Sequence, residues 1–324
     1  MNILVTGGAG YIGSHIVLLL GKLGHDVTVI DNLSTGRRES VIGAELIVGE
    51  VADSAFLDKV MNTKKFDACV HFAGSIIVPE SVTNPTKYYD NNTVNSLNLI
   101  QACLRNKISK FLFSSTAAVY GIPVGGECLE STPVMPINPY GKSKLMTEWM
   151  LEDTAAAHKD FNYVALRYFN VAGGNVEGLV GQCSPFSTHL IKIACETALG
   201  KRKSMSVFGD DYKTPDGTCI RDYIHTDDLA QAHIDSIEYL VAGGKSDIFN
   251  CGYGHGYSVN DVLETVKKVS GVDFEVTKGP RREGDAPNLI AVSDKIRKTL
   301  GWKPKYDDLS LIVRTALDRE RNLK

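Results

Sequence analysis

Short apolar runs alternate with segments of helical periodicity through the first half of the chain. Apolar runs bounded by polar residues are typical of strands buried on both faces of a parallel sheet. Six such strands are expected, over residues 3–6, 26–30, 45–48, 68–72, 110–114 and 163–168. Apolar positions three and four apart predict helices near residues 54–62, 85–105 and 140–158. Repeated strand and helix units predict an α/β fold with a doubly wound parallel sheet.

The pattern is less regular after residue 173. Residues 174–220 are rich in Gly, Ser, Pro and Lys, a similar region follows residue 251, and both are interpreted as parts of a smaller lobe. Between them, residues 221–225 and the helical run 227–240 are expected to return to the main sheet. The predicted domains are a large sheet domain, residues 1–173 with 221–250, and a smaller α/β lobe, residues 174–220 with 251–324.

A glycine-rich turn joins the first predicted strand to a first predicted helix. Gly7, Gly10 and Gly13 follow residues 3–6 directly, and apolar spacing over residues 16–23 indicates the helix. These glycines allow a tight turn and close approach of the backbone to a pyrophosphate, to which the helix N-terminus would donate hydrogen bonds. The position of the turn predicts a dinucleotide site in a Rossmann domain.

A carboxylate ends the second predicted strand. Asp31 there is suited to accept both hydroxyls of an adenosine ribose and would repel a 2′-phosphate, which favours NAD over NADP. Arg37 and Arg38 follow this strand, and basic residues there could bind the 2′-phosphate of NADP. The alternative is that they are solvated charges of a loop.

Tyr140 and Lys144 are the candidate catalytic pair. Asn138-Pro139 favours a helix start, so the two side chains are four residues apart on one helix face. An ammonium beside a phenol lowers the phenol pKa from its usual value near 10, as a general base requires. Thr116, after the fifth predicted strand, is the candidate hydrogen-bond partner of the phenol and of a substrate oxygen. The alternative is a solvated Tyr–Lys pair and a structural Thr cap.

Composition narrows the class of partner. A net charge of −3 gives no reason to expect nucleic acid or an anionic membrane. The seven cysteines are odd in number and form no C-x-x-C pair, so neither a disulfide framework nor a metal site is predicted. No apolar run approaches 18 residues and no leader follows Met1, so a cytoplasmic protein acting on small molecules is expected.

With these features, the sequence resembles the extended short-chain dehydrogenase/reductase superfamily, and within it the UDP-sugar 4-epimerases. The resemblance covers nearly the whole chain. It is carried by TGGAGYIGSH (6–15), DNLSTG (31–36), YYDNN (88–92), NPYGKSK (138–144), LRYFNVAGG (166–174), DGTCIRDYIH (216–225) and RREGD (281–285).

The resemblance implies a role for each matched residue. Thr116, Tyr140 and Lys144 would be catalytic. The implied NAD site comprises Gly7, Gly10, Tyr11, Ile12, Gly13, Asp31, Asn32, Ser34, Gly36, Glu50, Val51, Phe72, Ala73, Gly74, Asn91, Tyr140, Lys144 and Tyr168. The implied UDP-hexose site comprises Thr116, Asn170, His189, Leu190, Val207, Phe208, Arg221, Arg282, Asp285 and Leu289.

The implied reaction is the reversible 4-epimerisation of UDP-glucose and UDP-galactose. It would pass through a 4-keto sugar by transient oxidation of C4 on tightly bound NAD. A homodimer joined through the helices near 85–105 and 140–158 is also implied. Ala117-Ala118 argues against a 4,6-dehydratase, which needs an acid there. A UDP-pentose or UDP-uronate 4-epimerase, or a non-catalytic NAD-sensing module, stays open as an alternative.

Several positions depart from the usual pattern of the family. Thr116 stands where many members have Ser, and Glu50 where Asp is usual. Ser75-Ile76 replaces a Leu-Lys pair, so a Lys contact to the nicotinamide ribose is expected to be missing. His189 replaces an Asn that contacts the diphosphate, while Leu289 replaces a Tyr associated with rejecting N-acetylhexosamines. The smaller Leu289 predicts some activity on UDP-GlcNAc and UDP-GalNAc.

Overall fold

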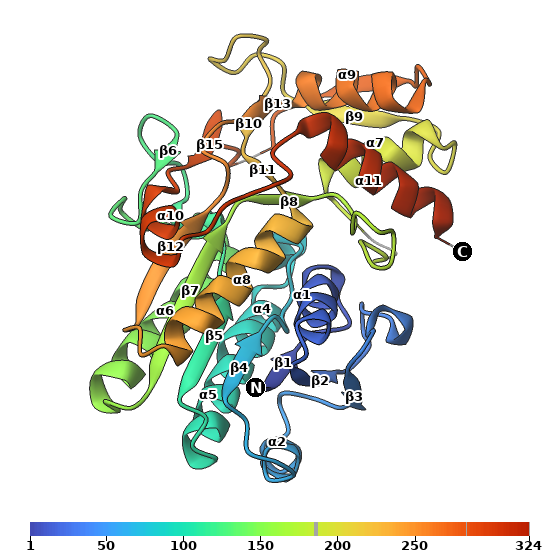
Figure 1. Ribbon diagram of the computed structural model, residues 1–324. Helices are drawn as coiled ribbons and strands as arrows, with labels where there is room; N and C mark the ends of the chain where they lie inside the picture. Colours follow the sequence, from blue (N-terminus) through green and yellow to red (C-terminus); the bar gives the residue numbers. More distant parts are fainter. Residues whose placement is uncertain (185–186, 283, 324) are drawn as a thin grey trace.

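The centre of the fold is a seven-stranded parallel sheet. The computed structural model describes residues 1–184, 187–282 and 284–323. Its main sheet has the order β12-β7-β5-β4-β1-β2-β3 (Figure 1). These strands are β1 Asn2–Thr6, β2 Asp26–Asp31, β3 Glu45–Val48, β4 Ala68–His71, β5 Lys110–Ser114, β7 Asn162–Tyr168 and β12 Asp247–Cys251. The predicted doubly wound α/β fold is confirmed.

Helices cover both faces of this sheet. Ile3 and Val5 of β1 enter the hydrophobic core that contains α1 and α8, whereas Leu4 between them enters the core that contains α2, α5 and α6. Successive strand residues point to opposite faces, so a sheet buried on both sides requires apolar residues at consecutive positions. The covering helices are α1 Tyr11–Lys22, α2 Ser54–Met61, α5 Asn95–Arg105, α6 Pro139–Ala157 and α8 Thr226–Val241.

The strand order reverses at β1, which pairs with both β2 and β4. Connections leave this point in opposite directions, and ligands of such sheets bind beside the reversal, beyond the carboxyl ends of the strands. The turns that follow β1, β2, β4, β5 and β7 all end at this edge, and each contains predicted site residues.

The segment predicted as one helix over 85–105 has an interruption. It contains α4 Pro85–Tyr88, a π-helix Tyr89–Val94 and α5, and it is preceded by α3 Val78–Thr83. Within the π-helical turn, the Asn92 carbonyl accepts hydrogen bonds from the side-chain hydroxyls of Ser96 and Thr147. Single π-turns of this kind are frequent at functional sites.

The smaller lobe is more regular than its composition suggested. It contains α7 Leu190–Ala198, β9 Met205–Phe208, α9 Val259–Ser270, β14 Val276–Gly279 and α11 Leu309–Asn322. A four-stranded sheet has the order β13-β10-β15-β6. Its strands are β13 Tyr257–Ser258, β10 Ile220–Arg221, β15 Asn288–Ala291 and β6 Glu127–Cys128. The predicted domain boundaries stay a prediction.

The predicted return to the main sheet is made by the helical run and not by the residues before it. Residues 221–225 do not rejoin the main sheet: β10 lies in the four-stranded sheet, and β11 Tyr223–His225 pairs with β8 Asn170–Ala172. The chain returns through α8 to β12, the seventh strand, then continues through β13, α9, β14 and β15 to α10 Asp294–Leu300 and the terminal helix α11. β12 begins with a charged residue and has only two fully apolar side chains before Cys251, so no apolar run marked it.

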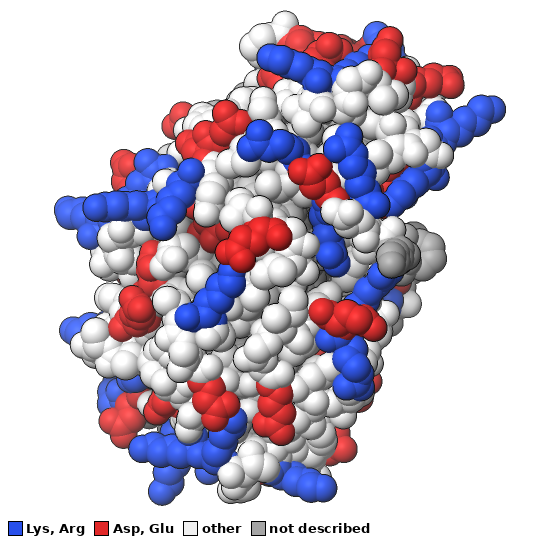
Figure 2. All heavy atoms as spheres, turned by 45° about the vertical axis from the view of Figure 1, so that its right-hand side comes forward, with Lys and Arg blue, Asp and Glu red and all other residues white. Residues whose placement is uncertain are grey.

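Charges are mixed over the surface. Figure 2 shows Lys and Arg interspersed with Asp and Glu on the face that it presents, rather than gathered into a patch of one sign. Among the described residues, no helix combines the length and the apolar character needed to cross a membrane. All seven cysteines have buried free thiols.

Candidate active site

The turn after β1 forms a cradle of backbone N–H groups. Gly7 has a φ of +75°, and a Cβ there would lie 2.5 Å from the Ala73 nitrogen. A Cβ on Gly13 would lie 2.3 Å from the Gly7 carbonyl oxygen. α1 begins after Gly10, which provides no side-chain cap, so the first-turn N–H groups have no acceptor within the helix. Such a helix N-terminus is suited to bind a pyrophosphate.

The carboxylate of Asp31 faces this cradle. Ala9 N donates to Asp31 Oδ2 at 2.9 Å, and Leu33 N donates to Oδ1 at 2.8 Å. Each oxygen of an ionised carboxylate keeps a further lone pair, which a ribose hydroxyl can use. Asn32 donates to Glu50 at 3.2 Å, which orders the carboxylate at the adenine end. Arg37 and Arg38 are exposed beside this loop.

The floor of the crevice follows β4. Phe72 N and Ala73 N both donate to the Thr6 carbonyl, at 2.9 and 3.1 Å. A Cβ on Gly74 would lie 3.0 Å from Asn92 Oδ1 and 3.5 Å from Lys144 Nζ, so small residues keep this surface open. The structure fits the prediction that a cofactor passes close to the backbone here.

Asn92, a residue that the sequence reasoning missed, joins this floor to α6. Its Oδ1 accepts from Ser75 N at 2.7 Å, and its Nδ2 donates to Ser143 Oγ at 3.0 Å. Ser143 in turn donates to the Tyr140 carbonyl at 2.7 Å. Asn91, which was predicted, donates to Ser75 Oγ at 2.9 Å. Both asparagines lie in the YYDNN stretch, which was the available signal.

Tyr140, Thr116 and Lys144 lie together at the carboxyl end of β5. Asn138 caps α6 by accepting from Gly141 N at 2.8 Å, and this places Tyr140 in the first turn. The Thr116 hydroxyl accepts from Ala118 N at 3.1 Å and lies near enough to the Tyr140 phenol to lower its pKa. Lys144 Nζ donates to the Ser114 carbonyl at 3.0 Å. All three predicted catalytic side chains are buried, which excludes the alternative of a solvated helix face.

The expected effect of Lys144 on the phenol is wrong in this structure. Burial raises the pKa of Tyr140, and the hydrogen bond from Thr116 opposes that shift. The Lys144 ammonium lies over the Phe113 ring, 5.0 Å from its centroid, and burial lowers the pKa of Lys144 to about 8. Thr116 is therefore the group that acts on the phenol here.

Tyr168, predicted to line the NAD site, lies at the carboxyl end of the main sheet. It ends β7, and its hydroxyl hydrogen-bonds Ser114 Oγ on the neighbouring strand β5. Asn170, two residues further on, is exposed. It lies at the start of β8, with its backbone N–H donating to the Asp222 carbonyl at 3.0 Å.

One part of the predicted sugar-nucleotide site lies on the four-stranded sheet. Arg221 of β10 is paired in register with Leu289 of β15. Arg221 forms an ion pair with Asp285 at 3.3 Å. Leu289 is half-buried and packs against the cluster that contains Ala117 and Val119. This brings Leu289 beside the turn that follows Thr116.

A second part joins a guanidinium to an aromatic ring. The Arg282 guanidinium lies 4.1 Å from the centroid of the Phe208 ring, which is partly exposed. Arg281 points elsewhere, since it forms an ion pair with Asp211 at 2.6 Å. Arg282 is thus the guanidinium of this loop that is available to an anion. Glu283, in the same motif, lies outside the described residues.

His189 and its neighbours connect the two lobes. His189 precedes α7, and its Nδ1 lies 3.1 Å from Gln182 Nε2. Its ring lies 6.4 Å from that of Tyr11, and burial lowers the pKa of His189. Leu190 follows it at the start of α7, and Val207 is buried in β9.

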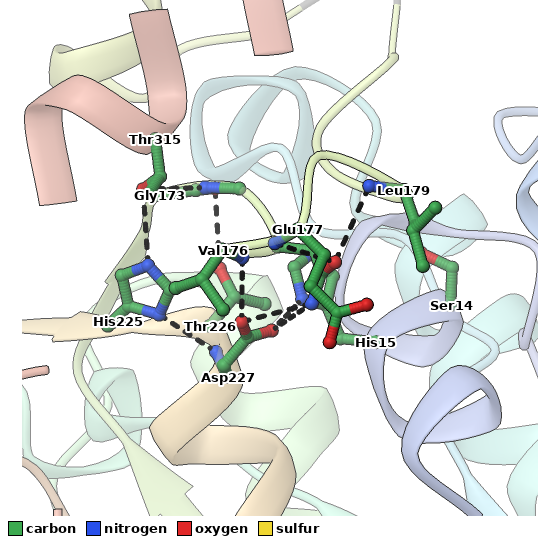
Figure 3. A network of polar contacts seen from close by, with 12 residues as sticks. Ser14, His15, Gly173, Val176, Glu177, Leu179, His225, Thr226, Asp227 and Thr315 are labelled. Carbon is green, nitrogen blue, oxygen red and sulfur yellow. Dashed lines mark hydrogen bonds and ion pairs between the residues drawn. The ribbon is translucent and has the colours of Figure 1, made fainter. Parts of the chain in front are cut away.

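A polar network fixes α1 against the loop that leads into the smaller lobe (Figure 3). Asp227 accepts from His15 Nδ1 at 2.6 Å and from Val176 N at 3.0 Å. The Tyr11 hydroxyl donates to the Gly173 carbonyl at 2.6 Å. The helix that would bind the pyrophosphate is thereby linked to the chain that leaves β8.

Fold and site together define the class of protein: a dinucleotide-binding enzyme of the short-chain dehydrogenase/reductase superfamily. The glycine cradle, Asp31 and the open floor at Gly74 fit NAD. The model of the NAD dependent epimerase/dehydratase family matches residues 3–252. The chain belongs to this NAD-dependent family.

Individual relatives and solved structures support this family assignment. A UDP-glucose 4-epimerase of Azospirillum brasilense is 54% identical over 324 residues, covering 100% of this chain and 93% of that protein. The structure of the UDP-Glc/GlcNAc 4-epimerase from Campylobacter jejuni is similar with a TM-score of 0.87 and 49% identity, covering 99% of each chain. UDP-glucose 4-epimerase from Brucella ovis in complex with NAD has a TM-score of 0.95 and 42% identity, covering 98% of this chain and 97% of that one.

Proposed function

We propose that this protein interconverts UDP-glucose and UDP-galactose by inverting C4 of the hexose. The observation that carries the proposal is that Thr116, Tyr140 and Lys144 are all buried at the carboxyl end of β5, in a chain that also has the glycine cradle and the Arg221 and Arg282 guanidiniums. Relatives named UDP-glucose 4-epimerase, similar over nearly their whole length, support the substrate.

NAD supplies a hydride acceptor for C4 of the sugar. Tyr140 removes the proton from the 4-hydroxyl, and the Thr116 hydroxyl holds the phenol oxygen in place. Lys144, anchored on the Ser114 carbonyl, provides a positive charge beside the crevice floor. With NAD bound, this step would give a 4-keto sugar, and Tyr140 would return its proton when C4 is reduced from the other face.

Inversion requires that the keto sugar rotate and present its other face without leaving the enzyme. Arg282 beside Phe208 and Arg221 beside Asp285 offer two separate guanidinium groups for the diphosphate. Arg221 lies in the four-stranded sheet and Arg282 in the loop before β15, whereas Thr116 follows β5 of the main sheet and Tyr140 lies on α6. The nucleotide would therefore be held firmly while the hexose keeps its freedom to rotate.

The test is turnover of UDP-galactose by the purified protein without added cofactor, followed by NMR. Formation of UDP-glucose would support both the epimerase chemistry and a tightly retained NAD. Turnover only of UDP-pentoses or UDP-uronates, which share this chemistry, would instead assign the nearest alternative. No turnover of any of these sugars with NAD supplied would leave the non-catalytic module as the better description.

Leu289 is proposed to set the size of the hexose that is accepted. Leu289→Tyr should lower turnover of UDP-GlcNAc relative to UDP-glucose by about 10-fold or more, because the larger side chain takes the space of the acetamido group. The measurement is the ratio of the two kcat/KM values. Leu289→Met, which is similar in volume, should preserve the ratio. An unchanged ratio in Leu289→Tyr would reject this role.

A homodimer is proposed through α5 and α6. Val94 before α5, Leu97 on α5 and Trp149 on α6 are exposed, although large apolar side chains are usually buried. Trp149→Arg should shift the protein from dimer to monomer, as measured by size-exclusion chromatography with light scattering. Val272→Arg, at an exposed apolar position after α9, is the matched control and should stay dimeric. A monomeric wild-type protein would contradict the proposal.

A further inference from the structure

The buried face of α6 that carries Tyr140 and Lys144 continues to Glu148. Residues four apart lie one above the other on a helix, so these three side chains form one row. Glu148 is 2% exposed, which is unusual for a carboxylate. It has no place in the proton transfer derived above, since its carboxylate faces away from the crevice toward Ser115 and Arg167.

Glu148 binds strand β7 and the turn that follows β5 at once. Its Oε1 accepts from Ser115 Oγ at 2.5 Å and from Arg167 Nε at 3.0 Å. Its Oε2 accepts from Arg167 Nη2 at 2.6 Å, so the guanidinium is held by two parallel hydrogen bonds. Arg167 also donates to the Tyr120 hydroxyl at 3.1 Å, at the end of the turn that begins with Thr116.

Each partner of Glu148 directly precedes a residue of the active site. Ser115 precedes Thr116, and Arg167 precedes Tyr168. Successive residues at a strand end point to opposite faces of the sheet. Holding Ser115 and Arg167 on one face therefore also fixes the positions of Thr116 and Tyr168 on the other. The same carboxylate is attached to α6, which carries Tyr140.

Stability alone is a weak reason for this arrangement. A buried ion pair loses hydration on folding, and well-packed apolar side chains often stabilise a protein as much. What the ion pair adds is a defined geometry, because a bidentate carboxylate permits one relative placement of helix and strand.

We propose that Glu148 is a positioning residue that sets the height of α6 against the Ser115–Thr116 turn, and so the approach of Thr116 to the Tyr140 phenol. This inference rests on the proposed function, in which Thr116 and Tyr140 act on the sugar 4-hydroxyl. The link through the Ser115 hydroxyl is the only direct hydrogen bond from the carboxylate to that turn among the described contacts.

Ser115→Ala tests the link without leaving a buried charge unpaired. We expect kcat for UDP-galactose to fall about 10- to 100-fold, since small displacements of reacting groups have effects of this size. The KM should change little, because the nucleotide is held by the other lobe. The acid limb of the kcat profile should move to higher pH, because loosening the Thr116 hydrogen bond raises the pKa of Tyr140. Ser115→Cys, with a weak donor, should recover part of kcat.

Glu148→Gln should lower stability more and kcat less than Ser115→Ala does. Its amide oxygen still accepts from Ser115, but Arg167 loses its charged partner, so the melting temperature should fall more than in Ser115→Ala while kcat falls less. Ser236→Ala is the matched control: Ser236 is a buried serine whose one hydrogen bond among the described residues is to the Ala232 carbonyl of its own helix α8. It should change melting temperature without changing kcat or its pH profile.

The outcomes separate the two proposals. An active Tyr140→Phe would overturn the proposed function itself. An inactive Tyr140→Phe together with a Ser115→Ala enzyme of wild-type kcat and pH profile would overturn the positioning role alone. The role would also fail if kcat losses simply followed losses of melting temperature across Ser115→Ala, Glu148→Gln and Ser236→Ala.

Discussion

Tyr140→Phe is expected to lower kcat for UDP-galactose by about 10²- to 10⁴-fold, the range usual for loss of a general acid or base. The substitution removes the phenolic oxygen, whose pKa Thr116 lowers, and leaves the ring in the same buried position. Binding of UDP should be nearly unchanged, because Arg221 and Arg282 lie on other elements. Steady-state kinetics and calorimetric titration with UDP measure the two effects.

The control for this substitution is Tyr163→Phe. Tyr163 lies on β7 near the opposite end from Tyr168 and is also buried, so the control removes a phenolic hydroxyl away from the crevice. It should keep wild-type kcat. Retention of turnover by Tyr140→Phe, or an equal loss in both variants, would mean that another group carries the proton.

Gly13→Ala is expected to prevent NAD from binding normally. At an ordinary helix position this change would stabilise the protein by up to about 1 kcal/mol, because alanine favours helix more than glycine does. Here the added Cβ would lie 2.3 Å from the Gly7 carbonyl and 2.8 Å from the Gly8 Cα. The cradle must open to relieve that overlap, which moves the N–H groups that would bind the pyrophosphate.

The measurement is the NAD content of the purified protein, by absorbance and by release on denaturation. We expect most of the cofactor to be lost, together with activity that excess NAD restores only in part. Gly21→Ala, on the same helix α1 but at its other end, is the matched control and should retain NAD. A Gly13→Ala protein with full NAD content would refute the geometry of the cradle.

Much of the fold could be predicted because its strands are buried on both faces. Runs such as Leu4 with its neighbours are apolar at consecutive positions, and the predicted strands agree with β1 to β5 and β7 within two residues at each end. β12 was missed because its sequence, DIFNC, has only two consecutive apolar residues between a charged and a polar one. α7 and β9 were missed because Gly, Ser and Lys around them masked two short regular segments.

The candidate active site could also be predicted from the sequence only in part. Tyr140, Lys144 and Thr116 were recognisable from spacing and position, and the structure brings them together. The direction of the Tyr140 pKa shift was not recognisable, because it depends on how much water the whole fold removes from the phenol. The ion pair between Glu148 and Arg167 could not be predicted either, since the two residues lie on different elements of the chain.

The sequence by itself determined the local elements and the chemical groups that they carry. Glycine spacing, the pairing of residues four apart and strand hydrophobicity all depend on near neighbours in the chain. Only the tertiary structure decided which strand ends lie side by side. β5 lies next to β7 in the sheet, although another strand and a long helix separate them in sequence. That adjacency brings Ser115 and Arg167 to one carboxylate, because hydrogen bonds and burial depend on distance in space.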